Sequence, residues 1–203
     1  RTRFDVLRSA TEETFEQFGV SDPDPDHIED MTIGATPRSV ANVCEAYDLQ
    51  PETFWRVRDK TMSGAQQAEA RAGRKTPYGD LGVLNDLNAS CGIVSSNQQE
   101  TVDFLLDHFD IGGLFETAYG REATVESLDL RKPNPHYLER ALADLDADSA
   151  LFVGDNESDI KAAENAGIDS AFIRRPHRTD WELNVWPTWD IDSLEDLHRV
   201  CSS

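Results

Sequence analysis

The chain has 203 residues, a formal net charge of −20 and an apolar fraction of 38%. This length corresponds to one domain, or to one domain with a smaller companion, and it allows a core to be buried. The longest apolar runs stop far short of the roughly 18 residues of a membrane span, and no secretory signal pattern is present. Because a strongly acidic protein repels nucleic-acid phosphate and anionic lipid, we expect no nucleic acid and no membrane as partners, and a cytoplasmic location.

Acidic residues are spread along the whole chain, whereas only four of the 19 basic residues are lysines. High salt shortens the range over which charges repel one another, so this composition is typical of halophilic adaptation. The three cysteines and five histidines show no disulfide or zinc spacing. We therefore expect any bound metal to be a hard cation held by oxygen ligands.

The first 75 residues predict helices and no strands. Apolar residues recur at helical spacing over residues 4–18. A second helix is expected from Thr36, and a third covers residues 51–73. We interpret residues 1–75 as a helical lid, or cap.

Residues 76–203 follow a different pattern, in which short apolar runs alternate with amphipathic segments. Such alternation is typical of an α/β fold with right-handed crossovers and a parallel sheet. We expect strands at residues 91–95, 115–119, 151–154 and 171–174, and helices at residues 101–109, 135–145 and 158–166.

Polar residues at the strand ends are the first candidates for a site, because ligands of open parallel sheets bind beyond the carboxyl ends of the strands. Ser95 ends the first expected strand, and its hydroxyl with the backbone N–H groups of Ser96 or Asn97 would suit a phosphate oxygen. The alternative is that Ser96 or Asn97 only caps the following helix. Lys132 lies in a later loop at the same edge, where its ammonium would neutralise a phosphoryl anion. A solvated loop lysine is the alternative.

Two acids follow the strand at residues 151–154. Asp155 ends this strand, and Asp159 stands in the first turn of the next helix. Two carboxylates that converge there suit Mg²⁺, which takes one or two carboxylates together with waters and substrate oxygens. Capping of the helix would explain Asp159 alone. Since it does not explain Asp155 or Glu157, we favour a metal site.

Taken in this order, the three stretches resemble the later motifs of the haloacid dehalogenase superfamily, which are a strand-terminal Ser or Thr, a loop Lys, and Gly-Asp-x-x-x-Asp. The matching segments are residues 93–95, 131–135 and 153–160. The resemblance covers the whole chain. It implies that residues 1–75 form the family's small helical C1-type cap and residues 76–203 its Rossmann-like core. The pattern looks like that of phosphoglycolate phosphatases and β-phosphoglucomutases, and with the acidic composition it suggests a haloarchaeal source.

The resemblance also implies a role for each residue of the phosphate site. Ser95 would bind a phosphoryl oxygen, and the N–H groups of Ser96 or Asn97 would add to it. Lys132 would clamp the phosphate and the nucleophile.

The same resemblance assigns the metal and cap residues. Asp155 would ligate Mg²⁺ directly, and Asp159 would hold the water shell of the metal or Lys132. Arg38 belongs to a loop that reaches the substrate in related caps, so it would pair with a second anionic group. A surface ion pair is the alternative for Arg38.

One motif of the family is missing. Its first motif, a strand ending in Asp-x-Asp-x-Thr or Asp-x-Asp-Gly-Val, supplies the nucleophilic aspartate, and nothing in the chain matches it. Asp5 lies in an expected helix and the acids of residues 22–26 follow a helix end, so neither is the nucleophile. In this fold the missing strand lies between those ending at Ser95 and Gly154, which would otherwise keep unpaired edges. We therefore expect about 10 to 20 residues with this strand before Arg1.

The sequence thus predicts a Mg²⁺-dependent phosphatase that hydrolyses a small phosphate monoester, such as phosphoglycolate, through an aspartyl-phosphate. Its partner would be a small phosphorylated metabolite, and the protein would be a monomer or a homodimer. Two alternatives stay open. One is a non-catalytic binding protein of the same fold that has lost its nucleophile, and the other is a phosphomutase that uses the same residues.

Overall fold

The computed structural model describes residues 2–201, which divide into two compact units. The first unit comprises the chain up to Thr76 together with residues 95–110 and 120–129. The second comprises residues 77–94, residues 111–119 and the chain from Leu130 onward. No helix among residues 2–201 combines the length and the apolar character needed to cross a lipid bilayer.

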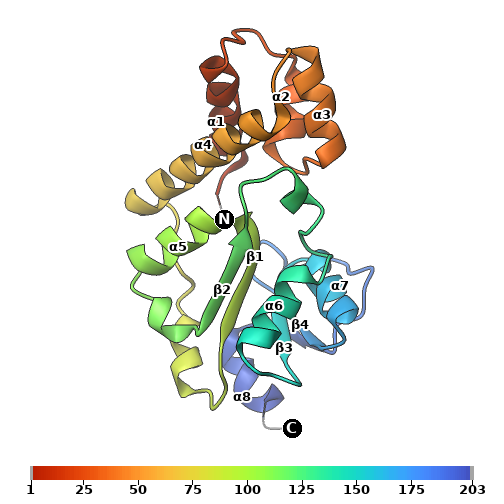
Figure 1. The fold of residues 1–203 in the computed structure, drawn as a ribbon. Helices are drawn as coiled ribbons and strands as arrows, with labels where there is room; N and C mark the ends of the chain where they lie inside the picture. The colour runs from red at the N-terminus through yellow and green to blue at the C-terminus, as the bar shows by residue number, and fades with distance from the viewer. Residues whose placement is uncertain (1, 202–203) are drawn as a thin grey trace. The chain divides into compact units, whose positions relative to one another are not determined.

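Helices make up most of the first unit (Figure 1), and those that precede Ala72 pack around one apolar core. Proline occupies one of the first two helical positions of three of them, where its missing N–H costs no hydrogen bond. The core contains the buried side chains of Phe15, Met31, Val40, Phe54 and Trp55. The helices are α1 (Phe4–Gln17), α2 (Pro25–Thr32), α3 (Pro37–Ala46), α4 (Pro51–Arg71) and α5 (Gln99–His108).

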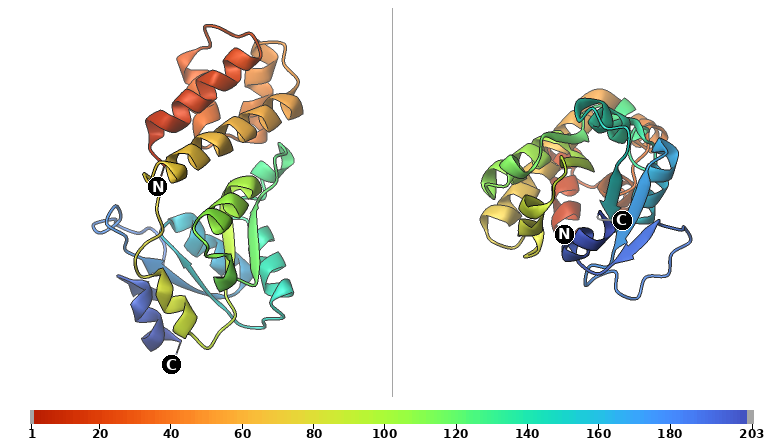
Figure 2. Two further views of the ribbon diagram at one scale, coloured as in Figure 1. Left: turned by 90° about the vertical axis from the view of Figure 1, so that its left-hand side faces the viewer. Right: turned by 90° about the horizontal axis from the view of Figure 1, so that it is seen from below.

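The second unit contains a three-stranded parallel sheet in the order β3-β4-β5. Its strands are β3 (Leu151–Gly154), β4 (Asp169–Ile173) and β5 (Trp189–Ile191), and its helices are α6 (His136–Asp144), α7 (Glu157–Ala166) and α8 (Leu197–Val200). In the register of the sheet, Val153 lies opposite Ala171, which in turn lies opposite Trp189. α8 lies beside the short 3₁₀ helix Leu81–Asp86 (Figure 2). The apolar side chains of this 3₁₀ helix pack against the cluster that contains Leu197 and Val200 of α8.

Two further strands pair with each other and form a separate sheet. They are β1 (Gly92–Gln98) and β2 (Thr117–Arg121), and the chain of each passes from one unit into the other. Three more 3₁₀ turns complete the described structure, at Gly112–Leu114, Glu126–Leu128 and Leu194–Asp196.

The strand β3 has one strand partner, β4, among the described residues, so its other edge is free. β4 pairs with β3 along one edge and with β5 along the other, and its residues 170–173 are all buried. Leu151, Phe152 and Val153 of β3 are each only partly buried, although they form an apolar run. Strands of parallel sheets are normally buried on both faces. β3 is therefore less covered than its sequence predicts.

The α/β class and the parallel sheet are confirmed, residues 2–75 contain helices and no strand as predicted, and strand 151–154 has the predicted bounds. The other strand boundaries shift by one to three residues, as is usual where local pattern alone sets them. The elements that were not expected include α2, β5, α8 and the 3₁₀ turns. α2 is capped by Asp24, whose side chain accepts the N–H of Asp26, and β5 is only three residues long.

Candidate active site

The turn from β3 into α7 carries Asp155 and Asp159, and hydrogen bonds to the backbone fix the Asp159 side chain. The side chain of Asn156 accepts the N–H of Ser158, while Asp159 Oδ2 accepts the N–H of Asn156 at 3.0 Å, which is a reciprocal cap of the helix. A β-carbon on Gly154 would lie 2.3 Å from the β-carbon of Asp159. Glycine is therefore required at residue 154 for Asp159 to fold back over the strand.

Lys132 is held by Asp159 and by a main-chain carbonyl of β1. Its ammonium Nζ lies 2.6 Å from Asp159 Oδ1 and donates to the carbonyl oxygen of Val94 at 3.0 Å. The side chains of Lys132 and Asp159 are 13% and 9% exposed, so the pair is shielded from most of the solvent. Val94 is the residue directly before Ser95. The structure thus brings Lys132 and Asp159 together, and both carboxylate oxygens of Asp159 have partners.

Asp155 contacts a histidine that sequence reasoning missed. Nε2 of His177 lies 2.8 Å from Asp155 Oδ2, and the Asp155 side chain is 40% exposed. His177 belongs to the run of residues 174–178, which follows the buried strand β4 and contains three arginines. The rule that polar residues after a parallel strand are site candidates would have singled out this run.

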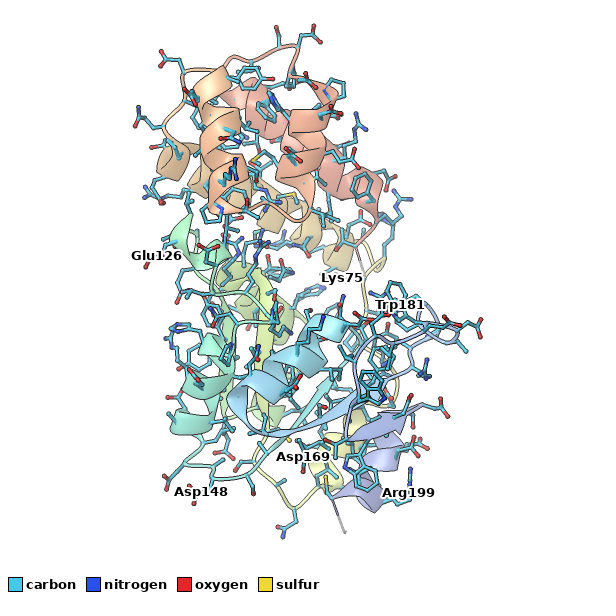
Figure 3. The ribbon with its side chains drawn as sticks, turned by 90° about the vertical axis from the view of Figure 1, so that its right-hand side faces the viewer. Lys75, Glu126, Asp148, Asp169, Trp181 and Arg199 are labelled. Atoms are coloured by element: carbon cyan, nitrogen blue, oxygen red, sulfur yellow. The ribbon has the colours of Figure 1, made fainter. Side chains whose placement is uncertain are left out.

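The loop after β4 is fastened to the first turn of α7. Oε1 of Glu157 accepts both the backbone N–H and the side-chain amide of Asn184, at 2.8 and 3.0 Å. These hydrogen bonds lower the pKa of the Glu157 carboxyl. In the same loop the guanidinium of Arg178 lies 3.9 Å from the centre of the Trp181 ring, which is labelled in Figure 3. The loop is thus held beside Asp155 by more than one contact.

The predicted phosphate-binding residues Ser95, Ser96 and Asn97 belong to the first unit and lie within β1, which continues to Gln98, so the prediction that Ser95 ends the strand is wrong. Ser95 Oγ accepts the N–H of Asn97 at 3.1 Å. The side-chain amides of Asn97 and Gln66 exchange two hydrogen bonds of 2.9 Å, and Gln66 also accepts from Lys75 at 2.9 Å. Burial lowers the pKa of Lys75, which is labelled in Figure 3. Asn97 is therefore held through its side chain as well as its backbone.

Two predicted substrate residues are less constrained. Ser96 is partly buried on β1. Arg38, in the first turn of α3, is exposed and makes no hydrogen bond or ion pair with any residue between 2 and 201 that the structure describes. Because Ser95 and Arg38 belong to the first unit and Lys132 to the second, their meeting at one site stays a prediction.

The residues present fit a magnesium site in part. No group of three or more His, Cys, Asp or Glu side chains converges as a metal site within the described part of the chain. Mg²⁺ needs only one or two carboxylates, because waters and substrate oxygens complete its shell. Asp155 suits one such ligand, since its side chain is half-exposed at a strand end. Asp159 already binds Lys132 and the α7 N-terminus, so its predicted metal role stays untested.

Asp190-x-Asp192 is an Asp-x-Asp sequence at the end of a strand, with Asp190 on β5 and Asp192 directly after it. In the sheet, β4 lies between β5 and β3. The guanidinium of Arg174 donates to both carboxylate oxygens of Asp190 at 2.7 to 3.2 Å. These acids therefore do not stand beside Asp155 at a neighbouring strand.

The sequence model for "Haloacid dehalogenase-like hydrolase" matches residues 3–173. The chain belongs to this family. Over 132 residues the chain is 29% identical to pyrophosphatase PpaX of Bacillus cereus, and the match covers 64% of the chain. It spans 59% of the length of that curated relative.

Solved structures of haloacid dehalogenase-like proteins share the fold. A haloacid dehalogenase-like hydrolase from Bacteroides fragilis has a TM-score of 0.65 at 22% identity, with 96% of this chain and 92% of that one covered. A protein from Lactobacillus plantarum named as a phosphoglycolate phosphatase has a TM-score of 0.65 at 15% identity, with 97% and 91% covered. At these identities the likeness concerns the fold alone.

Proposed function

We propose that the protein is a Mg²⁺-dependent phosphatase that hydrolyses a small phosphate monoester of the phosphoglycolate type. The observation that carries this proposal is the position of Lys132, whose ammonium is shielded from solvent between Asp159 and the carbonyl of Val94. A lysine fixed in this way between a carboxylate and the main chain of β1 suits a phosphoryl anion better than a solvated loop lysine does. The names of the relatives, a pyrophosphatase and a phosphoglycolate phosphatase, favour phosphate chemistry as well.

In this proposal Ser95 and the backbone N–H of Ser96 or Asn97 bind the phosphoryl oxygens, and Lys132 balances their charge. A carboxylate attacks phosphorus in line and displaces the alcohol of the ester, and water then hydrolyses the aspartyl-phosphate to release phosphate and the free carboxylate. Bound Mg²⁺, with Asp155 as one ligand, supplies further positive charge against the phosphoryl group. Asp159 keeps Lys132 in place, and Arg38 pairs with a second anionic group of the substrate.

The nucleophile would come from a strand that pairs with the free edge of β3. Two features support this position: β3 has a partner on one side only, and its apolar residues are only partly covered. A carboxylate at the carboxyl end of such a strand would stand next to Asp155. This strand would precede Arg1 in the gene product. The partner is then a small phosphorylated metabolite, and the protein a cytoplasmic monomer or homodimer of a halophile.

The test uses the full-length gene product in molar KCl. We expect Mg²⁺-dependent release of phosphate from p-nitrophenyl phosphate. A substrate panel with phosphoglycolate and pyrophosphate would show which of the two compounds, both suggested by the relatives' names, is hydrolysed faster. Lys132→Ala should abolish turnover, whereas Lys161→Ala, which removes an exposed lysine of α7, should not. If the gene product has no strand with Asp-x-Asp before Arg1 and releases no phosphate, the non-catalytic alternative is correct.

A further inference from the structure

The two carboxylate oxygens of Asp155 have different surroundings. Oδ2 lies 2.8 Å from Nε2 of His177, whereas Oδ1 accepts no hydrogen bond from the residues that the structure describes, 2–201. Oδ1 is also not among the described polar atoms that are buried without a partner, so it is open to solvent. One oxygen of Asp155 is therefore held by the protein, and the other is available to a ligand from solution.

The direction of the hydrogen bond between His177 and Asp155 follows from the chemistry of the two groups. A carboxylate can only accept, so Nε2 of His177 carries the hydrogen and donates it to Oδ2. A ring nitrogen that bears a hydrogen has no lone pair for a metal. While this hydrogen bond is intact, Nε2 can act on a metal only through Asp155, whose carboxylate it orients.

The backbone that carries His177 is a closed turn. The N–H of Arg178 donates to the carbonyl oxygen of Arg175 at 2.7 Å, so residues 175–178 form a turn with Pro176 and His177 at its two central positions. Proline is favoured at the first central position because its φ angle is fixed. The turn limits the directions in which the imidazole can point.

The arginines on both sides of His177 are bound to other groups, and these contacts fasten the turn. Arg174 binds Asp190, Arg175 donates to Asp80 at 2.6 Å, and the guanidinium of Arg178 lies 3.9 Å from the centre of the Trp181 ring. His177 is thus the side chain of the run 174–178 that contacts Asp155.

We infer that His177 is a positioning residue of the metal site: its Nε2–H holds Oδ2 of Asp155 and thereby presents Oδ1 to the divalent cation. This inference rests on the Mg²⁺ site of the proposed function and adds the residue that orients its direct ligand. Hydrogen-bond partners of metal ligands usually contribute about tenfold to a hundredfold to metal affinity. The side chains of His177 and Asp155 are 32% and 40% exposed, so we expect the lower end of this range.

Binding of Mn²⁺ to the full-length gene product in molar KCl tests this role without turnover. Mn²⁺ takes the same oxygen ligands as Mg²⁺, and the electron paramagnetic resonance signal of the aqueous ion measures its free concentration. We expect His177→Ala to raise the Kd for Mn²⁺ about tenfold. His198→Ala, which removes an exposed histidine of α8, is the matched control and should leave the Kd unchanged. Equal Kd values for the wild type and His177→Ala would overturn the inference.

The conservative variant His177→Gln tests the donor itself. Its side-chain amide keeps an N–H at a similar reach, so it should restore most of the affinity for Mn²⁺ that His177→Ala loses. If His177→Gln binds Mn²⁺ as weakly as His177→Ala does, the hydrogen bond to Asp155 is not the cause of the loss.

The dependence of activity on Mg²⁺ separates positioning from general support of the fold. Loss of positioning should raise the Mg²⁺ concentration for half-maximal phosphate release about tenfold in His177→Ala and leave kcat at saturating Mg²⁺ nearly unchanged. A loss of kcat that saturating Mg²⁺ does not restore, together with a lower free energy of unfolding in urea, would show that His177 only supports the turn.

Pulsed electron paramagnetic resonance of bound Mn²⁺ shows whether His177 is itself a ligand. A directly bound imidazole nitrogen couples strongly to the electron spin of the metal. We expect the same nitrogen coupling in the wild type and in His177→Ala. A strong coupling that is present in the wild type and absent from His177→Ala would make His177 a direct ligand and overturn its positioning role.

Failure of this inference and failure of the proposed function give different results. If Mn²⁺ binding depends on His177 as expected but no ester releases phosphate, the phosphatase function is wrong and the role of His177 stands. If phosphate release requires Mg²⁺ and Lys132 while His177→Ala binds Mn²⁺ normally, the function stands and the role of His177 is wrong. If the gene product binds no Mn²⁺, both are wrong.

Discussion

Lys132 and Asp159 form an ion pair of 2.6 Å that joins the loop before α6 to the first turn of α7. Asp159 uses its second oxygen to cap that helix, so the same carboxylate fixes both the lysine and the turn that presents Asp155. The position of Lys132 and the stability of the turn before α7 therefore depend on the same carboxylate, that of Asp159.

Lys132→Ala should lower the free energy of unfolding as well as activity. It leaves Asp159 as a shielded carboxylate without its cation, and breaking such a pair costs about 3 kcal/mol. Urea unfolding at constant molar KCl measures this cost. Lys161→Ala serves as the control, and a loss of the same size there would show that lysine content and not the ion pair is responsible.

Gly154→Ala should be one of the most damaging single changes in the second unit. The added β-carbon would lie 2.3 Å from the Asp159 β-carbon, so the α7 cap must move, and we expect a loss of about 3 kcal/mol or more.

Gly64→Ala is its matched control, because a β-carbon there meets nothing within 4 Å in the interior of α4. This change should raise the free energy of unfolding by about 0.5 to 1 kcal/mol. If both alanine variants unfold at the same urea concentration, the close approach at residue 154 does not matter.

Asp80 should make the second unit sensitive to acid. Burial favours the neutral form of this carboxyl, but hydrogen bonds from Arg175 at 2.6 Å and from the N–H of Leu194 outweigh it and lower the pKa of Asp80. A lowered pKa in the folded state means that the stabilisation is complete above the usual value of about 4 and is lost as the pH falls below it. The difference in unfolding free energy between the wild type and Asp80→Asn should therefore be largest at pH 7 and shrink below pH 4. A difference that is constant from pH 7 to pH 3 would contradict this assignment.

Cys44 should resist alkylation while the chain is folded. Burial raises the pKa of this α3 thiol to about 11, and only a thiolate reacts. At pH 8 iodoacetamide should modify the exposed Cys201 first and Cys44 only after urea is added, as mass spectrometry of peptides can show. Rapid modification of Cys44 in the folded protein would mean that α3 opens readily.

The sequence predicted those site features that depend on local pattern. Asp155 and Asp159 follow an apolar strand at fixed spacing, and the structure shows the expected strand, turn and capped helix there. The family resemblance gave either the water shell of a metal or Lys132 as the partner of Asp159, and in the structure Lys132 lies 2.6 Å from it.

Features that depend on distant contacts were not predictable. Asp59 and Arg121 are 62 residues apart, and each taken alone resembles any surface charge of a strongly charged chain. The contact of His177 with Asp155 depends on the path of an irregular loop. β5 is three residues long, too short to give a periodic signal, and it is defined by its pairing with β4.

The free edge of β3 has a practical consequence for handling the protein. Unpaired main-chain groups along an apolar strand are a template on which another polypeptide can add, which is the usual start of ordered aggregation. At low ionic strength the charge of −20 keeps two copies apart. The molar salt that suits such an acidic chain also screens this repulsion. Concentrated samples of residues 1–203 in high salt are therefore the condition in which turbidity and thioflavin binding should first be monitored.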